Sequence, residues 1–143
     1  MHKVEVNRTV DAPLERAWAV YTDHAGWNAW AGLQHSSVER EGAVERNGAG
    51  AVRCLGSYGF NAWEEILEFE PPARMTYRVV KGGLPMKNHL GEVLFEPDGP
   101  GTKVTWRCRF DSRVPGLGWP MRLYVHRFFR SALEGFDAHL RGN

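Results

Sequence analysis

The sequence predicts an α+β fold in which a curved antiparallel sheet of roughly seven strands wraps around one long C-terminal helix. Apolar residues recur from Met121 to Leu140 in steps of three or four, the spacing of one stripe on a helix of about 20 residues. Most of the chain before this stretch alternates between apolar and polar residues, as half-buried strands do. A single helix cannot bury its stripe alone, so we expect the sheet to cover it. A concave sheet closed by a helix leaves an interior space, and we look for the functional site there.

The N-terminal part is expected to hold one strand and two short helices. Residues 3–10 alternate as a first strand. Asp11-Ala12-Pro13 then begins a helix, because aspartate and proline are typical of helix starts. Residues 23–30 have the spacing of a second short helix that brings Trp27 and Trp30 to one side.

The middle of the chain predicts the remaining strands, at about 34–41, 49–56, 59–70, 73–81, 88–96 and 102–111. Turn-forming sequences separate them, including Pro71-Pro72 and the run Pro97-Asp98-Gly99-Pro100-Gly101. No repeat, linker or low-complexity segment appears, so we expect residues 1–143 to form a single domain.

Strand alternation predicts which side chains face the helix. Trp106 and Tyr77 fall on the apolar faces of their strands, and the inward phase of strand 88–96 includes His89 and Gly91. Because glycine has no side chain, we expect Gly91 to leave open space, within a cavity of roughly 300–1,000 Å³.

The strand at 59–70 permits two phases. One phase buries Trp63 and Phe69 and turns Glu65 inward, whereas the other buries Ile66 and turns Glu64 inward. The count of apolar residues favours the first phase, and a β-bulge would switch between them.

The composition argues against several classes of partner. A formal net charge of +1 gives no general electrostatic basis for nucleic-acid binding. No apolar run approaches the roughly 18 residues that span a bilayer, and the N-terminus lacks a signal-peptide core, so we expect a cytoplasmic protein without membrane insertion. Cys54 and Cys108 are too few for a disulfide scaffold and are expected to be buried free thiols.

Motifs for cofactors and metals are not supported. The stretch around Gly48 and Gly50 has two of the three glycines of a dinucleotide motif and leads into a strand, so we expect no nicotinamide, flavin or nucleotide cofactor. His89 and Glu92 lie three apart on a strand and point to opposite faces. His24 and His35 are too far apart in sequence to argue for a shared ion, and no metal site is predicted.

The order of elements resembles the SRPBCC superfamily, which has the START and birch-pollen-allergen-like helix-grip fold. Within it the chain is similar to the polyketide cyclase/dehydrase-like group. The motifs that carry the resemblance span nearly the whole chain: Val10-Asp11-Ala12-Pro13, residues 23–30, residues 68–77, residues 101–106 and the long C-terminal helix. The resemblance implies a helix-grip fold and a single ligand-binding domain over residues 1–143. It carries over no catalytic set, because this fold hosts carriers, cyclases and interaction modules alike.

These observations define candidate site residues. The expected ligand-binding residues are Trp63, Tyr77, His89, Trp106, Tyr124 and Phe128. His89 and Glu65 are the catalytic candidates, because imidazole titrates near neutral pH and a cavity carboxylate has a raised pKa.

Three functions remain open. The first is carriage of a small hydrophobic molecule that is aromatic, polyketide-like or lipid-like. The second is a cyclase/dehydrase-type enzyme that uses His89 and a cavity glutamate. The third is a protein-interaction module with a vestigial cavity. The loop Lys81–Lys87 is either a lid or an ordinary hairpin connection, and the oligomeric state is open between a monomer and a homodimer.

Overall fold

The computed structural model describes residues 1–142 as one sheet with three helices. The elements, in chain order, are β1 (His2–Val10), α1 (Leu14–Thr22), the 3-10 helix η1 (His24–Ala29), β2 (His35–Arg40), β3 (Val52–Ser57), β4 (Phe60–Glu70), β5 (Arg74–Gly82), β6 (Met86–Asp98), β7 (Gly101–Ser112) and α2 (Gly118–Arg141). The expected α+β helix-grip fold is confirmed. None of the helices within residues 1–142 has both the length and the apolar character needed to cross a bilayer.

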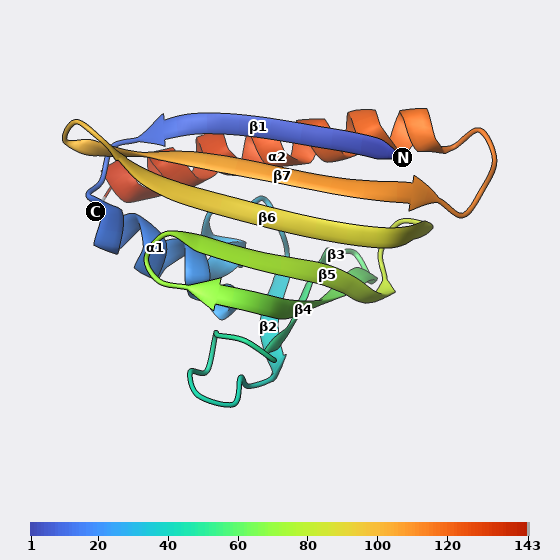
Figure 1. Ribbon diagram of the computed structural model, residues 1–143, viewed down its shortest axis with the longest axis horizontal. Coiled ribbons are helices and arrows are strands. Elements are labelled where there is room, and N and C mark those ends of the chain that lie inside the picture. The colour runs from blue at the N-terminus through green and yellow to red at the C-terminus, as the bar shows by residue number, and fades with distance from the viewer. Residues whose placement is uncertain (143) are drawn as a thin grey trace.

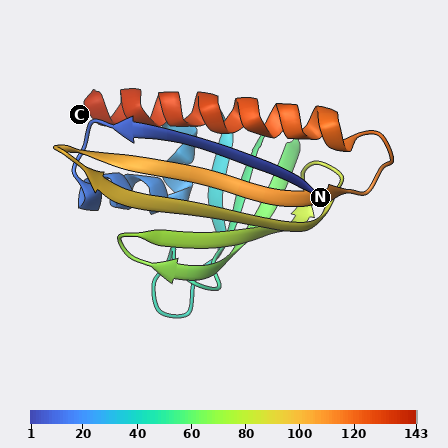
Figure 2. The ribbon, with the colours of Figure 1, turned by 45° about the horizontal axis from the view of Figure 1, so that its top comes forward.

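The seven strands form one antiparallel sheet in the order β1-β7-β6-β5-β4-β3-β2 (Figure 1). The sheet curves, and α2 runs beside β1 along most of its length (Figure 2). This topology leaves β1 and β2 as the two edges of the sheet. The long helix covers one edge, while α1 and η1 follow β1 and lead the chain across to β2.

The core lies between α2 and the inner face of the sheet. The buried residues of the α2 stripe include Met121, Val125, Phe129, Ala132, Leu133, Phe136 and Leu140. Trp106 of β7 stacks on Phe129, with ring centroids 4.2 Å apart. Gly135 allows α2 to approach η1, because a Cβ at this position would lie 2.1 Å from the carbonyl oxygen of Trp30. The apolar stripe therefore packs as the periodicity predicts.

The second short helix is a 3-10 helix rather than an α-helix, and it anchors two tryptophans in the core. Trp27 and Trp30 are both buried, as their spacing predicts. The indole nitrogen of Trp27 donates a hydrogen bond to the carbonyl oxygen of Tyr21, at 2.7 Å. This bond satisfies a buried polar group and fixes η1 against the end of α1.

The inward-facing side chains of strand β4 differ from those that the sequence predicts. Its register against β5 shifts between Trp63 and Glu64 and again between Ile66 and Phe69. Ile66 is fully buried and Glu64 faces inward, so the phase that placed Trp63 and Glu65 inside is wrong. The second irregularity turns Phe69 back toward the core, where it packs against Trp18. Bulges of this kind change the face of every following side chain, which a regular alternation cannot represent.

Candidate functional site

A cavity of about 240 Å³ lies between α2 and the inner faces of strands β3 to β7. Its walls are mainly apolar, with contributions from Leu33, Leu55, Val79, Leu84, Met86, Val125 and Phe128. Tyr124 lines the cavity although its exposed fraction is 58%, and Phe60 lines it although 56% exposed. These two aromatic residues therefore mark where the cavity reaches the surface.

The cavity is smaller than the sequence predicts, because Gly91 does not leave open space. A Cβ placed on Gly91 would lie 2.2 Å from Cζ of Tyr77, so the Tyr77 ring already fills the volume above this glycine. The indole nitrogen of Trp106 donates a hydrogen bond to the Tyr77 hydroxyl at 2.7 Å. Burial, the largest cause, raises the pKa of Tyr77 well above its ordinary value. Tyr77 is therefore a neutral, fixed part of the wall.

His89 is held at the cavity by a bulge in β6. The register between β6 and β7 shifts between Lys87 and Leu90, and Asn88 has a φ of 55°, in the left-handed region. The backbone N–H of Val79 donates to Nδ1 of His89 at 3.1 Å, so the neutral ring carries its proton on Nε2. Burial lowers the pKa of His89, an effect that the Glu64 charge opposes and the Arg53 charge reinforces.

The charged part of the site is a buried ion pair. Arg53 of β3 is fully buried, and its Nε donates to Oε1 of Glu64 at 2.9 Å. Its Nη2 lies 2.9 Å from the same carboxylate. The guanidinium carbon sits 4.3 Å from the ring centroid of Trp27 and 4.6 Å from that of Tyr77. Burial lowers the pKa of Arg53, but the Glu64 charge, together with Tyr21, Tyr77 and the Glu64 hydrogen bond, outweighs this effect, so the net pKa is raised.

A second histidine completes this network. Nε2 of His24 donates to the carbonyl oxygen of Asn47 at 2.9 Å, which leaves Nδ1 to accept from Nη1 of Arg53 at 3.3 Å. Burial, reinforced by the Arg53 charge, lowers the pKa of His24 to about 3. His24 is therefore neutral at physiological pH and accepts a hydrogen bond from a buried cation.

The structure brings together five of the six expected ligand-binding residues. Tyr77, His89, Trp106, Tyr124 and Phe128 all line the cavity. The sixth, Trp63, does not: its ring lies 4.6 Å from Nζ of Lys81.

The catalytic candidate Glu65 also lies away from the cavity. Its carboxylate pairs with Arg78 at 2.8 Å and with Arg40 at 3.0 Å. Glu64 occupies the inward position instead, because the inner face of β4 alternates without interruption through Ala62, Glu64 and Ile66.

Sequence reasoning missed Arg53 and His24. The signal for Arg53 is its phase, because Leu55 and Ser57 follow at two-residue steps and both line the cavity. An arginine in the inner phase of a strand must find a partner, and the adjacent strand supplies Glu64. His24 lies in η1 and gives no periodic signal.

A protein-family model described as polyketide cyclase/dehydrase and lipid transport matches residues 1–141. The chain belongs to this family. A comparison with curated proteins gives no match. Solved structures agree on the fold of this family member.

Three of these structures illustrate the likeness. The major latex-like protein 151 from Panax ginseng has a TM-score of 0.78 and 22% identity, with 96% of each chain covered. Ara h 8.0201 has a TM-score of 0.75 and 15% identity, with 99% of each chain covered. The di-domain ARO/CYC BexL from the BE-7585A biosynthetic pathway has a TM-score of 0.77 and 20% identity; the match covers 99% of this chain and 47% of BexL. At these identities the likeness concerns the fold alone.

Proposed function

We propose that this family member binds and carries a small hydrophobic molecule in the cavity between α2 and the sheet. The observation that carries the proposal is the apolar cavity itself, which the protein's own side chains leave unfilled. An apolar ligand gains free energy there by leaving water, and the rigid sheet keeps the site preformed. An interaction module with a vestigial cavity would not need to maintain such a space.

The polar wall restricts the ligand further. Arg53 approaches Glu64 at Oε1 with both Nε and Nη2, and no hydrogen bond within residues 1–142 occupies Oε2, which is therefore available as an acceptor. His89 offers its Nε2–H as a donor, since Nδ1 is occupied by Val79. A ligand hydroxyl group can donate to Oε2 of Glu64 and accept from the Nε2–H of His89. We therefore assign the cavity to a molecule with an apolar, aromatic or polyketide-like body and one hydroxyl or phenol.

We propose that the loop between β5 and β6 acts as a lid over the cavity. Gly83 and Leu84 line the cavity from this loop, and Met86 lines it from the start of β6. Gly82 and Gly83 have φ values of 68° and 71°, a backbone conformation that other residues rarely adopt. The two glycines allow a sharp turn that lays Leu84 over the cavity, and they give the loop freedom to open.

A matched pair of variants tests the carrier function. Val79 lines the cavity, whereas its neighbour Val80 is exposed on the other face of β5. Binding of phenols and of fluorescent apolar probes is titrated in wild type, Val79→Phe and Val80→Phe, with folding checked by circular dichroism. We expect Val79→Phe to lower affinity about tenfold or more, because it fills the cavity, while Val80→Phe binds as wild type. Failure of the wild type to bind either class would overturn the proposal.

A second candidate is a cyclase or dehydratase reaction, because Glu64 and His89 line the same cavity. A carboxylate and an imidazole on one wall can move protons on a bound substrate. The Glu64 carboxylate is already engaged by Arg53, which is why binding is the first proposal. Turnover of a poly-β-keto substrate analogue that is lost in both Glu64→Gln and His89→Phe would favour the enzyme; turnover unaffected by either change would exclude it.

A further inference from the structure

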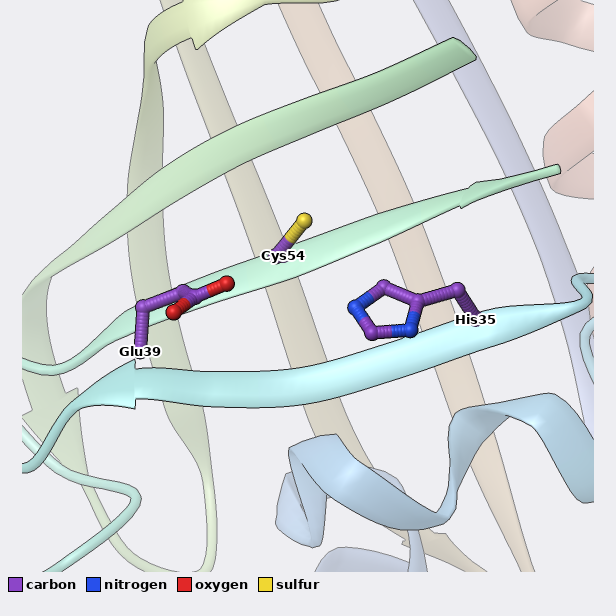
Figure 3. A group of neighbouring side chains, drawn as sticks. All are labelled: His35, Glu39 and Cys54. Carbon is purple, nitrogen blue, oxygen red and sulfur yellow. The ribbon is translucent and has the colours of Figure 1, made fainter. Parts of the chain in front are cut away.

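The outer side of the β2–β3 edge carries three potential metal ligands that the cavity does not use. His35 and Glu39 lie on β2, and Cys54 lies on β3 (Figure 3). Their ligating atoms all lie within 4.8 Å of one another. Cys54 alternates with the inward-facing Arg53 and Leu55, so its thiol belongs to the opposite face of the sheet. This cluster is therefore separate from the proposed ligand cavity.

The backbone of β2 brings the three side chains together. Ser37 pairs with Cys54 across the two strands, which places His35 and Glu39 on either side of the thiol. The register then shifts between Val38 and Arg40, so Glu39 is the extra residue of a bulge. Bulges on edge strands redirect a side chain, and here the redirected group is a carboxylate that lies beside the thiol (Figure 3).

The surroundings of Glu39 differ from those of three carboxylates on β4 and β6. Glu65, Glu68 and Glu92 each form ion pairs with arginine. Glu39 forms no ion pair among residues 1–142, and its neighbours in the cluster are an imidazole and a thiol. The nearby cation, Lys81, is held over the Trp63 ring. A carboxylate without an ion pair, together with an imidazole and a thiol, supplies the mixed oxygen, nitrogen and sulfur donors that can bind a divalent ion.

We propose that His35, Glu39 and Cys54 form a binding site for a Zn²⁺-type divalent ion, with the fourth position open to water. Sulfur, imidazole nitrogen and carboxylate oxygen are the three donor types that Zn²⁺ prefers. Zinc–ligand distances of about 2.0–2.3 Å in a tetrahedron place donors about 3.5 Å apart, so the cluster must contract by about 1 Å. His35 and Glu39 are both exposed, whereas the sulfur of Cys54 is buried. Nε2 of His35 forms an exposed hydrogen bond with Oγ of Ser37 at 3.1 Å, so the contraction would move the two exposed side chains and either keep this bond through Nδ1 ligation or break it.

Bound metal would tie the edge strand β2 to β3, the strand whose Arg53 pairs with Glu64 of the cavity wall. Metal binding at this site would therefore stabilise the pairing of β2 with β3. This inference does not depend on the proposed function, because it concerns the opposite face of the sheet.

The test uses Co²⁺ as a spectroscopic substitute for Zn²⁺ on the full chain under reducing conditions. We expect one equivalent of Co²⁺ to produce a thiolate-to-metal charge-transfer band, which Zn²⁺ then removes by competition. Cys54→Ser should abolish the band. His35→Gln and Glu39→Gln, which change exposed side chains and should leave the fold intact, are each expected to weaken binding by about 10–100-fold or more.

Two controls make the outcome decisive. Cys108→Ser removes the other buried thiol, and Glu41→Gln removes a carboxylate that lies just beyond β2. Both should bind Co²⁺ as wild type does. The proposal is overturned if wild type gives no charge-transfer band at micromolar to millimolar Co²⁺, or if His35→Gln and Glu39→Gln bind as tightly as wild type.

Discussion

At the scale of single residues, the site is organised around a buried cation. Arg53 contacts Glu64 through its charge, His24 through a hydrogen bond, and Trp27 and Tyr77 through their ring faces. Each contact offsets part of the cost of removing a guanidinium from water. The network holds Glu64 in place at the cavity and keeps His24 neutral. Under the proposed function, ligand recognition and stability would therefore depend on the same few side chains.

The first prediction concerns His89. His89→Phe removes the Nε2–H donor while keeping a ring of similar size, so phenolic ligands should lose one buried hydrogen bond. We expect their affinity to fall about 5- to 150-fold, which corresponds to about 1–3 kcal/mol. Plain hydrocarbon probes should bind with unchanged affinity. The measurement is a fluorescence titration of both variants, and equal losses for both ligand classes would show that His89 is only part of the wall.

The second prediction concerns pH and His24. Its pKa is about 3 in the folded protein and about 6.5 in the unfolded chain, so below pH 6.5 the unfolded state binds more protons. Stability should therefore be complete above pH 6.5 and fall as the pH is lowered toward 3. When the pH falls from 7 to 5, the titration of His24 should lower the free energy of unfolding by about 2 kcal/mol. His89, whose pKa is also lowered, acts in the same direction.

Urea denaturation at pH 7 and pH 5 measures this loss. His24→Gln cannot titrate, and should reduce the difference between the two pH values by about 2 kcal/mol. Glu65 and Asp137 have lowered pKa values, so their contribution is lost only below the ordinary range of carboxylates. A variant that keeps the full pH dependence would show that His24 is accessible to protons in the folded state.

At the scale of elements, the sequence predicts the strands and the long helix well. It does not predict which side chains of the site face inward where a strand is irregular. The stripe from Met121 to Leu140 and the alternation of β7 are regular, and both pack as predicted. In β4, Glu64 and Ile66 share the inward phase, and the irregularity between Ile66 and Phe69 then turns Phe69 inward as well, so the apolar count favoured Glu65 wrongly. Bulges depend on pairing with strands that are distant in sequence, so local periodicity contains no information about them.

The third prediction compares two phenylalanines of α2 that lie two helical turns apart. Phe136 is fully buried against Trp30, with ring centroids 4.9 Å apart, whereas Phe128 borders the cavity. Phe136→Ala should lower the free energy of unfolding by about 3–5 kcal/mol. Phe128→Ala should cost about 1–2 kcal/mol, because this ring already lacks neighbours on its cavity side. Chemical denaturation of both variants checks the order, and equal losses would contradict a cavity at this level of the helix.

At the scale of the whole molecule, the cavity is a region that folding leaves unpacked. A close-packed interior would gain dispersion energy that this fold gives up between α2 and the sheet. The sequence predicts that such a space exists, because a curved sheet must close on a helix. Its volume could not be predicted, because the ring of Tyr77 lies over Gly91 only in the folded molecule. A ligand that fills the space should restore the missing contacts and stabilise the entire fold.

The fourth prediction measures this stabilisation. A phenolic ligand at 100 times its dissociation constant should add about 2.7 kcal/mol to the free energy of unfolding. For a chain of this length, that raises the melting temperature by roughly 5–11 °C. In Val79→Phe, a tenfold weaker affinity at the same ligand concentration should reduce the gain to about 1.4 kcal/mol and roughly halve the shift. Val80→Phe should show the full shift. Equal shifts in Val79→Phe and Val80→Phe would place the ligand outside the cavity, because only the first change alters the cavity wall.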